Sequence, residues 1–164
     1  MQARVESRVL PRVSVQTEDF DLSAEVAKLR AADKRVGAVC AFVGTVRDIN
    51  DGDVVSELEL EHYPGMTEKS IQRMLNEAQQ RFEMISAKVI HRVGLLNPLD
   101  QIVLVIVTSA HRGQSFQACE FLMDYLKTQA PFWKKETGPN GSCSTNFDCT
   151  NPLPTSTPTP TPPP

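Results

Sequence analysis

The chain has 164 residues, of which 40% are hydrophobic and 23% are charged, so its length suits one domain with its own core. Its 17 basic and 20 acidic residues give a formal net charge of -3, which excludes a strongly basic nucleic-acid-binding protein. No run approaches the roughly 20 apolar residues of a membrane helix, and the first residues lack the apolar stretch of a signal peptide. We therefore expect a cytoplasmic location and neither nucleic acid nor membrane as a partner.

The first half of the chain alternates between strand and helix patterns. Residues 8–16 carry alternating valines interrupted by Pro11, which is typical of an edge strand. Ser23 is expected to cap a short helix that places Leu22, Val26 and Leu29 on one face. Two further strands are predicted at residues 36–46, a nearly continuous apolar run, and 54–63, where apolar and acidic residues alternate, with a turn-rich loop at 47–53 between them.

The second half continues this alternation. A helix is predicted over residues 67–82, because its apolar residues recur at the spacing of one buried stripe. Strands are predicted at 87–93 and 101–108. A second long helix is expected over 114–129, ended by Pro131 and followed by a short strand at 132–136. The residues expected to face inward on that helix are Phe116, Cys119, Met123 and Leu126. The order β-α-β-β-α-β-β-α-β predicts an α+β fold with helices packed on one face of a mainly antiparallel sheet.

From Gly138 onward the composition changes to Pro, Thr, Ser, Asn and Gly, with most of the 12 prolines of the chain. Such a segment cannot bury enough apolar surface to order itself. The sequence therefore predicts a folded domain over residues 1–137 and a disordered tail over 138–164.

The four cysteines, at positions 40, 119, 143 and 149, do not have the spacing of metal ligands, so no metal and no cofactor is expected. Unpaired thiols are the expected state in a reducing compartment, and a disulfide between Cys143 and Cys149 is the alternative.

Three positively charged places at the ends of predicted elements are candidates for function. They are Gly44–Arg47 (GTVR), Ser109–Gly113 (SAHRG) and Lys127–Glu136 (KTQAPFWKKE). In the second, His111 and Arg112 precede a helix, where free backbone N–H groups favour an anion. Each place alone is better explained by ordinary solvated side chains: Arg47 pairing with a nearby acid, Lys127 pairing with Asp124, and a solvated lysine pair at 134–135. Only convergence of these cations on one site would favour catalysis.

Four segments nevertheless carry a resemblance. LEHYPGMTEK (Leu60–Lys69), IHRVG (Ile90–Gly94), VTSAHRG (Val107–Gly113) and MDYLKTQAPFWKKE (Met123–Glu136) occur in the order found in the large, catalytic subunit of molybdopterin synthase, which the chain resembles over roughly residues 36–136. The resemblance implies an α/β hammerhead-type fold and a sulfurtransferase. It also implies a homodimer at the core of a heterotetramer, with a small ubiquitin-like sulfur carrier that ends in a Gly-Gly thiocarboxylate. The substrate of that family is cyclic pyranopterin monophosphate, which receives two sulfurs to form the dithiolene of molybdopterin in molybdenum cofactor biosynthesis.

The resemblance also implies the site residues. The substrate-contacting positions of the family fall on Thr45, Val46, Arg47, His111, Arg112, Lys127, Lys134, Lys135 and Glu136. Lys127 and Lys134 are the expected catalytic residues, and Arg47, His111 and Arg112 are expected to hold the phosphate and the pterin. Phe42 and Met123 are candidates for lining the site.

The chain departs from the family pattern after Glu136, where the usual charged, tryptophan-containing segment is replaced by the polar tail. Two alternatives therefore stay open. One is a non-catalytic dimeric module that binds the sulfur carrier or an anionic pterin. The other is a general phosphate-binding enzyme.

Overall fold

The structure is a computed structural model that describes residues 12–50, 53–54, 56–139 and 143–146. Its elements, in chain order, are β1 (Val13–Gln16), α1 (Leu22–Ala32), β2 (Ala38–Thr45), β3 (Ile49–Asn50), β4 (Asp53–Val54), β5 (Glu57–His62), α2 (Met66–Arg81), β6 (Ser86–Arg92), β7 (Gly94–Leu96), β8 (Gln101–Ser109), α3 (Arg112–Thr128), β9 (Phe132–Thr137) and β10 (Cys143–Asn146). The predicted α+β class is confirmed, and the elements follow the predicted order with β3, β4, β7 and β10 added.

One four-stranded sheet has the order β1-β6-β8-β2. Its central strand β8 is buried from Ile102 to Ser109, as expected for an uninterrupted run of β-branched residues with neighbours on both sides and both faces. β1 lies at one edge and pairs in parallel with β6, which confirms the predicted edge strand. β2 lies at the other edge and runs antiparallel to β8.

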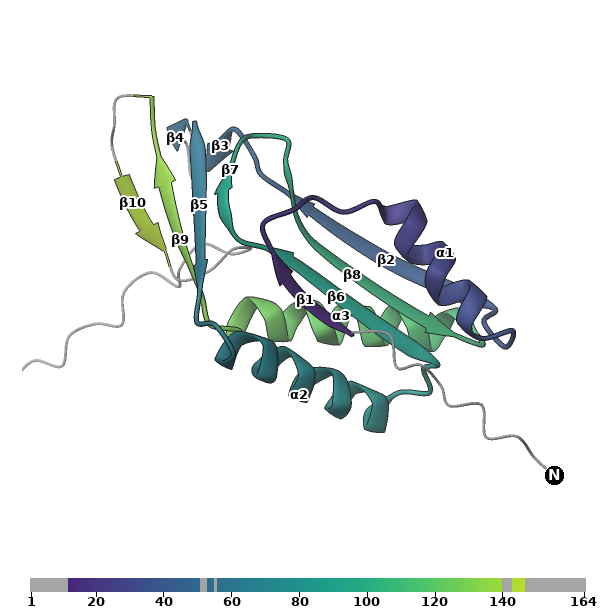
Figure 1. Ribbon diagram of the computed structural model, residues 1–164. Coiled ribbons are helices and arrows are strands. Elements are labelled where there is room, and N and C mark those ends of the chain that lie inside the picture. The colour runs from purple at the N-terminus through teal and green to yellow at the C-terminus, as the bar shows by residue number, and fades with distance from the viewer. Residues whose placement is uncertain (1–11, 51–52, 55, 140–142, 147–164) are drawn as a thin grey trace, which may run out of the picture.

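A second four-stranded sheet, of order β10-β9-β5-β7, is antiparallel throughout and stands at one end of the first (Figure 1). The predicted loop at 47–53 was wrong in one respect, because Ile49–Asn50 and Asp53–Val54 pair as a small hairpin. Turn-forming residues can connect two very short strands as readily as they form an open loop.

The helices cover both faces of the first sheet. α2 and α3 pack on the face that carries Val89, Val103 and Val105, and Figure 1 shows them side by side below the sheet. α1 lies on the opposite face, where Leu29 packs with Ile90 and the neighbouring aliphatic residues. The prediction that helices occupy one face was therefore wrong for α1, because a central strand that is apolar on both sides needs a cover on each.

Two local predictions about the helices were also wrong. Asp21, rather than Ser23, caps α1: its carboxylate accepts a hydrogen bond from the backbone N–H of Ala24 at 3.0 Å. Phe116 was expected to face inward, but its side chain is 62% exposed. Cys119, Met123 and Leu126, predicted on the same stripe, are buried.

The predicted boundary at residue 137 coincides with the end of β9. Inside the segment predicted to be disordered, Cys143–Asn146 forms β10 and pairs with β9. Residues 140–142 and 147–164, including Cys149 and the Pro/Thr run, lie outside the described residues, so the division into domain and tail remains a prediction.

Candidate functional site

α3 and the edge strand β2 enclose an open groove of about 360 Å³. Alternation along β2 turns Cys40 and Phe42 toward α3, and one helical stripe of α3 supplies the other wall. The lining residues are Cys40, Ala41, Phe42, Phe116, Cys119, Glu120, Met123, Asp124 and Lys127. Both predicted lining residues, Phe42 and Met123, are therefore on the groove, together with the predicted catalytic Lys127.

Lys127 lies in the last turn of α3, and its side chain is half-buried. The expected pairing with Asp124 is not among the ion pairs of the described part of the chain. Both residues line the groove, so the Lys127 amine is directed to a cavity with apolar walls and one acidic flank. The predicted helical ion pair is therefore not observed for Lys127, and its side chain lines the groove instead.

Lys134 has different surroundings. In β9 it stands opposite Leu60 of β5, on the face that carries the core, and its side chain is only 14% exposed. Its ammonium forms an ion pair with Glu136, two residues further on and therefore on the same face. Lys135 is exposed and points to the other face, opposite Glu59. The prediction that both lysines are solvated is therefore confirmed for Lys135 and wrong for Lys134.

The start of α2 anchors β9 in this position. The Thr67 hydroxyl donates a hydrogen bond to the Pro131 carbonyl at 3.1 Å and accepts one from the backbone N–H of Tyr63 at 3.0 Å. Thr67 is fully buried, so both bonds are protected from water. The turn between α3 and β9, and with it the spacing of Lys127 and Lys134, is fixed by this contact.

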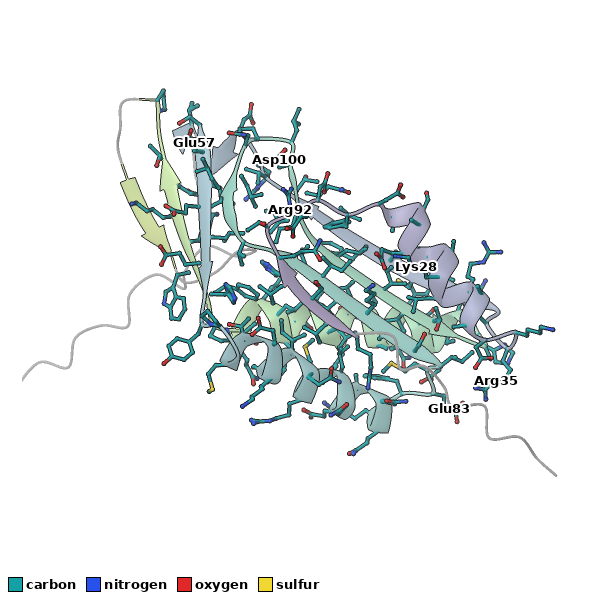
Figure 2. All side chains as sticks on the ribbon, in the orientation of Figure 1. Lys28, Arg35, Glu57, Glu83, Arg92 and Asp100 are labelled. Carbon is teal, nitrogen blue, oxygen red and sulfur yellow. The ribbon has the colours of Figure 1, made fainter. Side chains whose placement is uncertain are left out.

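Thr45, Val46 and Arg47 come at the end of β2. Thr45 is exposed, whereas Val46 is buried in the core and exchanges backbone hydrogen bonds with the turn before β8, from its N–H to Asp100 and from Leu99 to its carbonyl. Arg47 follows directly and is exposed. Figure 2 labels Asp100 at this end of the first sheet, close to the second sheet.

His111 and Arg112 lie at the opposite end. β2 and β8 are antiparallel, with Thr45 opposite Gln101 and Ala38 opposite Ser109. Eight residues of strand, or roughly 25 Å, therefore separate the Arg47 end from the end where α3 begins. Arg35 and Glu83 mark that far end in Figure 2. Within one copy of the chain, His111 and Arg112 therefore lie at the opposite end of β2 from Thr45, Val46 and Arg47.

The far end has the features of an anion site. His111 is the N-cap residue of α3, and its side chain makes no capping hydrogen bond; the first turn contains no acidic residue. The Ser109 hydroxyl donates to the His111 carbonyl at 2.6 Å and holds the loop, while His111, Arg112 and Gly113 stay exposed. Exposed backbone N–H groups beside two basic side chains favour a phosphate or carboxylate.

The other two histidines, His91 and His62, make contacts within the fold. His91 is fully buried, stacks on Phe132 with ring centroids 3.7 Å apart, and bonds the Arg92 carbonyl through Nδ1 at 2.8 Å. Burial lowers the pKa of His91 to about 4. His62 pairs with Glu68 at the start of α2. Within the described residues, no cluster of three or more His, Cys, Asp or Glu side chains is arranged to hold a metal, and no helix is long and apolar enough to cross a membrane.

Phe116 and the cysteines of the groove are the site residues that sequence reasoning missed. The spacing of the groove-lining residues of α3, at positions 116, 119–120, 123–124 and 127, continues one helical stripe. The spacing predicted that these residues share one face of the helix, but not which of them would be buried by neighbouring elements and which exposed. Phe116 is exposed because β2, at the sheet edge, has no further strand beside it to cover the start of α3.

Comparison with known proteins confirms the resemblance. The family model for MoaE protein matches residues 15–129. A molybdopterin synthase catalytic subunit from Ralstonia nicotianae is 62% identical over 133 residues, which cover 81% of this chain and 76% of that protein. The solved structure of the molybdopterin biosynthesis MoaE protein from Burkholderia ambifaria has 52% identity and a TM-score of 0.74, covering 87% of this chain and 93% of that one. Molybdopterin synthase from Staphylococcus aureus has 27% identity and a TM-score of 0.73, covering 81% and 95%.

Proposed function

The chain belongs to the MoaE family, and we propose that it is the catalytic subunit of molybdopterin synthase. In this reaction a sulfurtransferase moves sulfur from the C-terminal thiocarboxylate of a small carrier to cyclic pyranopterin monophosphate. Two such transfers form the dithiolene of molybdopterin. The identity of 62% with a catalytic subunit over most of both chains supports the activity. A cytoplasmic location is part of the proposal, and the free thiols of Cys40 and Cys119 fit a reducing compartment.

The observation that carries the proposal is the groove that leads to Lys127. A tail that ends in Gly-Gly has no side chains at its tip, so it can lie in the groove between Phe42 and Met123. Its thiocarboxylate would then lie beside the Lys127 ammonium. We infer that Lys127 neutralises the charge of this group and assists proton transfer as the sulfur attacks the substrate and the carboxylate leaves.

Lys134 supplies the second positive charge. Because it is mostly buried and paired with Glu136, its ammonium is held in one place instead of sampling solvent. Glu136 is thus the positioning residue of Lys134, while Thr45, Val46 and Lys135 shape the surroundings. A fixed ammonium can stabilise developing negative charge without reorganisation during the reaction.

The substrate phosphate needs a further partner, and the geometry suggests where it comes from. Arg47 follows the end of β2, but His111 and Arg112 lie roughly 25 Å away at the start of α3. In a symmetric homodimer, the surface at one end of a copy can meet the other end of its partner. We infer that the site is composite: Arg47, Lys127 and Lys134 come from one copy, and His111 and Arg112 from the second.

The assay that tests this function mixes the purified chain with thiocarboxylated carrier and cyclic pyranopterin monophosphate, then oxidises the product to its fluorescent derivative. Product formation is expected. Failure to form product, with carrier binding intact, would instead favour the non-catalytic module. One observation favours that alternative. β10, from the divergent segment, pairs with β9 directly beside Lys134 and Glu136, so the changed segment adjoins a residue proposed to be catalytic.

A further inference from the structure

Two cysteines far apart in the sequence meet on the wall of the groove. Cys40 lies in β2 and Cys119 in α3, and both line the same cavity as Lys127. Cys119 is only 5% exposed and belongs to the core, whereas Cys40 is half-buried and packs against that core from the edge of the sheet. Both thiols are free in the structure.

The surroundings give the two thiols different reactivities. Burial, together with the charge and hydrogen bonding of the adjacent Cys40 thiol, raises the pKa of Cys119 to about 12. Cys119 is therefore protonated and shielded in the reduced protein, and it loses its proton only as it attacks an oxidised Cys40. Cys40 is the more accessible of the two and is the first to meet an oxidant that enters the groove. An accessible thiol with a second thiol directly behind it is the arrangement of a redox-sensitive pair.

We propose that Cys40 and Cys119 form a reversible disulfide when a peroxide enters the groove, and that this bond closes the groove to the carrier tail. The Cys40 sulfur attacks the O–O bond, giving a sulfenic acid and one water. The Cys119 sulfur then attacks the sulfenic sulfur, the S–S bond forms, and a second water leaves with the remaining proton. Two thiols are oxidised and one peroxide is reduced to two waters, and a dithiol reductant reverses the change.

The second half of this proposal rests on the proposed function, because it assumes that the tail occupies the groove. The bond would tie β2 to α3 two residues before Phe42 and about one helical turn before Met123, the two walls assigned to the tail. A covalent tie at this point would prevent β2 and α3 from moving apart to admit a chain between them. Oxidation would thus stop sulfur transfer without altering either catalytic lysine.

The first arm of the test detects the bond itself. The full chain carrying Cys143→Ser and Cys149→Ser, which leaves only this pair, is treated with hydrogen peroxide and digested without reduction. A cross-linked peptide containing Cys40 and Cys119 is expected, with loss of two hydrogens, a raised Tm, and reversal by dithiothreitol. Cys40 oxidised to sulfenic or sulfinic acid with no cross-link would overturn the proposal. The variants Cys40→Ala and Cys119→Ala, made in the same background, should show neither the cross-link nor the rise in Tm.

The second arm detects closure, using a synthetic peptide that ends in Gly-Gly. The reduced protein is expected to bind it at least about 10-fold more tightly than the oxidised protein, while Cys40→Ala should bind equally before and after peroxide. Equal binding by reduced and oxidised protein would overturn closure. A reduced protein that fails to bind the peptide would overturn the assignment of the tail to the groove, whereas the cross-link from the first arm would still establish the redox pair.

Discussion

The two lysines assigned to catalysis occupy different environments within one site. Lys134 is fixed by Glu136 against the core, while Lys127 faces the groove from the last turn of α3. A fixed cation suits charge stabilisation, and a cation at an open cavity suits contact with an incoming group. The residue-level predictions follow from this difference.

Replacing Lys127 by alanine should abolish turnover and leave folding and carrier binding largely intact. The side chain is half-buried at the groove and holds no ion pair with Asp124, so its removal disturbs little of the structure. The fluorescent product assay and a pull-down with the carrier measure the two effects. Lys69→Ala, which removes an exposed lysine of α2, is the matched control and should retain turnover. Undiminished turnover in Lys127→Ala would refute the role given to Lys127.

Arg112→Ala should weaken substrate binding by about 1–3 kcal/mol, or roughly 5- to 150-fold in Kd, because one charged hydrogen bond to the substrate is lost. Arg112 is exposed at the start of α3, so the fold should be unaffected. Calorimetric titration with cyclic pyranopterin monophosphate measures the change. Arg73→Ala, an exposed arginine on α2, controls for the loss of one positive charge. Equal affinities for these two variants would exclude Arg112 from the binding site.

At the level of elements, the periods of the sequence predicted most strands and helices within a few residues. The uninterrupted apolar run at 101–108 became the central strand β8, and the stripe on 67–82 became α2. Pairwise choices between neighbouring polar residues were less predictable. Asp21 and Ser23 are both good cap residues, and only the backbone geometry decides which one receives the free N–H.

Asp21→Ala should destabilise the protein by about 1 kcal/mol, since the N–H of Ala24 loses its acceptor. Ser23→Ala should have almost no effect, because Ser23 lies inside α1 and does not cap it. Urea denaturation of the two variants distinguishes these roles. A larger loss of unfolding free energy for Ser23→Ala than for Asp21→Ala would show that Ser23, and not Asp21, caps the helix.

The buried His91 makes stability depend on pH. Its pKa is about 4 in the folded protein against 6.5 for an ordinary histidine, so the unfolded chain binds more protons between these values. Stability is therefore fully present above pH 6.5 and is lost as the pH falls toward 4, by an amount of order 3 kcal/mol. His91→Phe, which removes the titrating group while keeping an aromatic ring against Phe132, should flatten the dependence in urea titrations. His111→Gln, at an exposed position, should keep the wild-type dependence, and a His91→Phe curve parallel to wild type would contradict the argument.

At the level of the whole molecule, the sequence located three cationic places but could not show how they lie relative to each other. Sequence order puts Arg47 and Arg112 in separate loops, and only the antiparallel register of β2 and β8 reveals that these loops are at opposite ends. Lys127 and Lys134 could be grouped from sequence, because seven residues and a single turn separate them. The relative placement of these cations could not be predicted, because it depends on the pairing of strands that are far apart in the sequence.

A composite site predicts complementation between Lys127→Ala, which lacks turnover, and Arg112→Ala, assayed at a substrate concentration well below the Kd of the Arg112→Ala variant. Mixing Lys127→Ala with Arg112→Ala, after unfolding and refolding together, creates heterodimers in which one site carries both changes and the other carries neither. About a quarter of wild-type turnover should return, since half of the dimers are mixed and each has one intact site. The two variants refolded separately and then combined without subunit exchange are the control. Absence of recovery in mixed dimers would place the whole site within one copy.

α3 links the groove to the anion-binding end, because it begins at Arg112 and contains Lys127 in its last turn. An inserted residue in its middle would turn everything beyond that point by about 100° and advance it by about 1.5 Å. Lys127 would then leave the groove while Arg112 kept its place. The number of residues between these two cations is consequently as constrained as their chemistry.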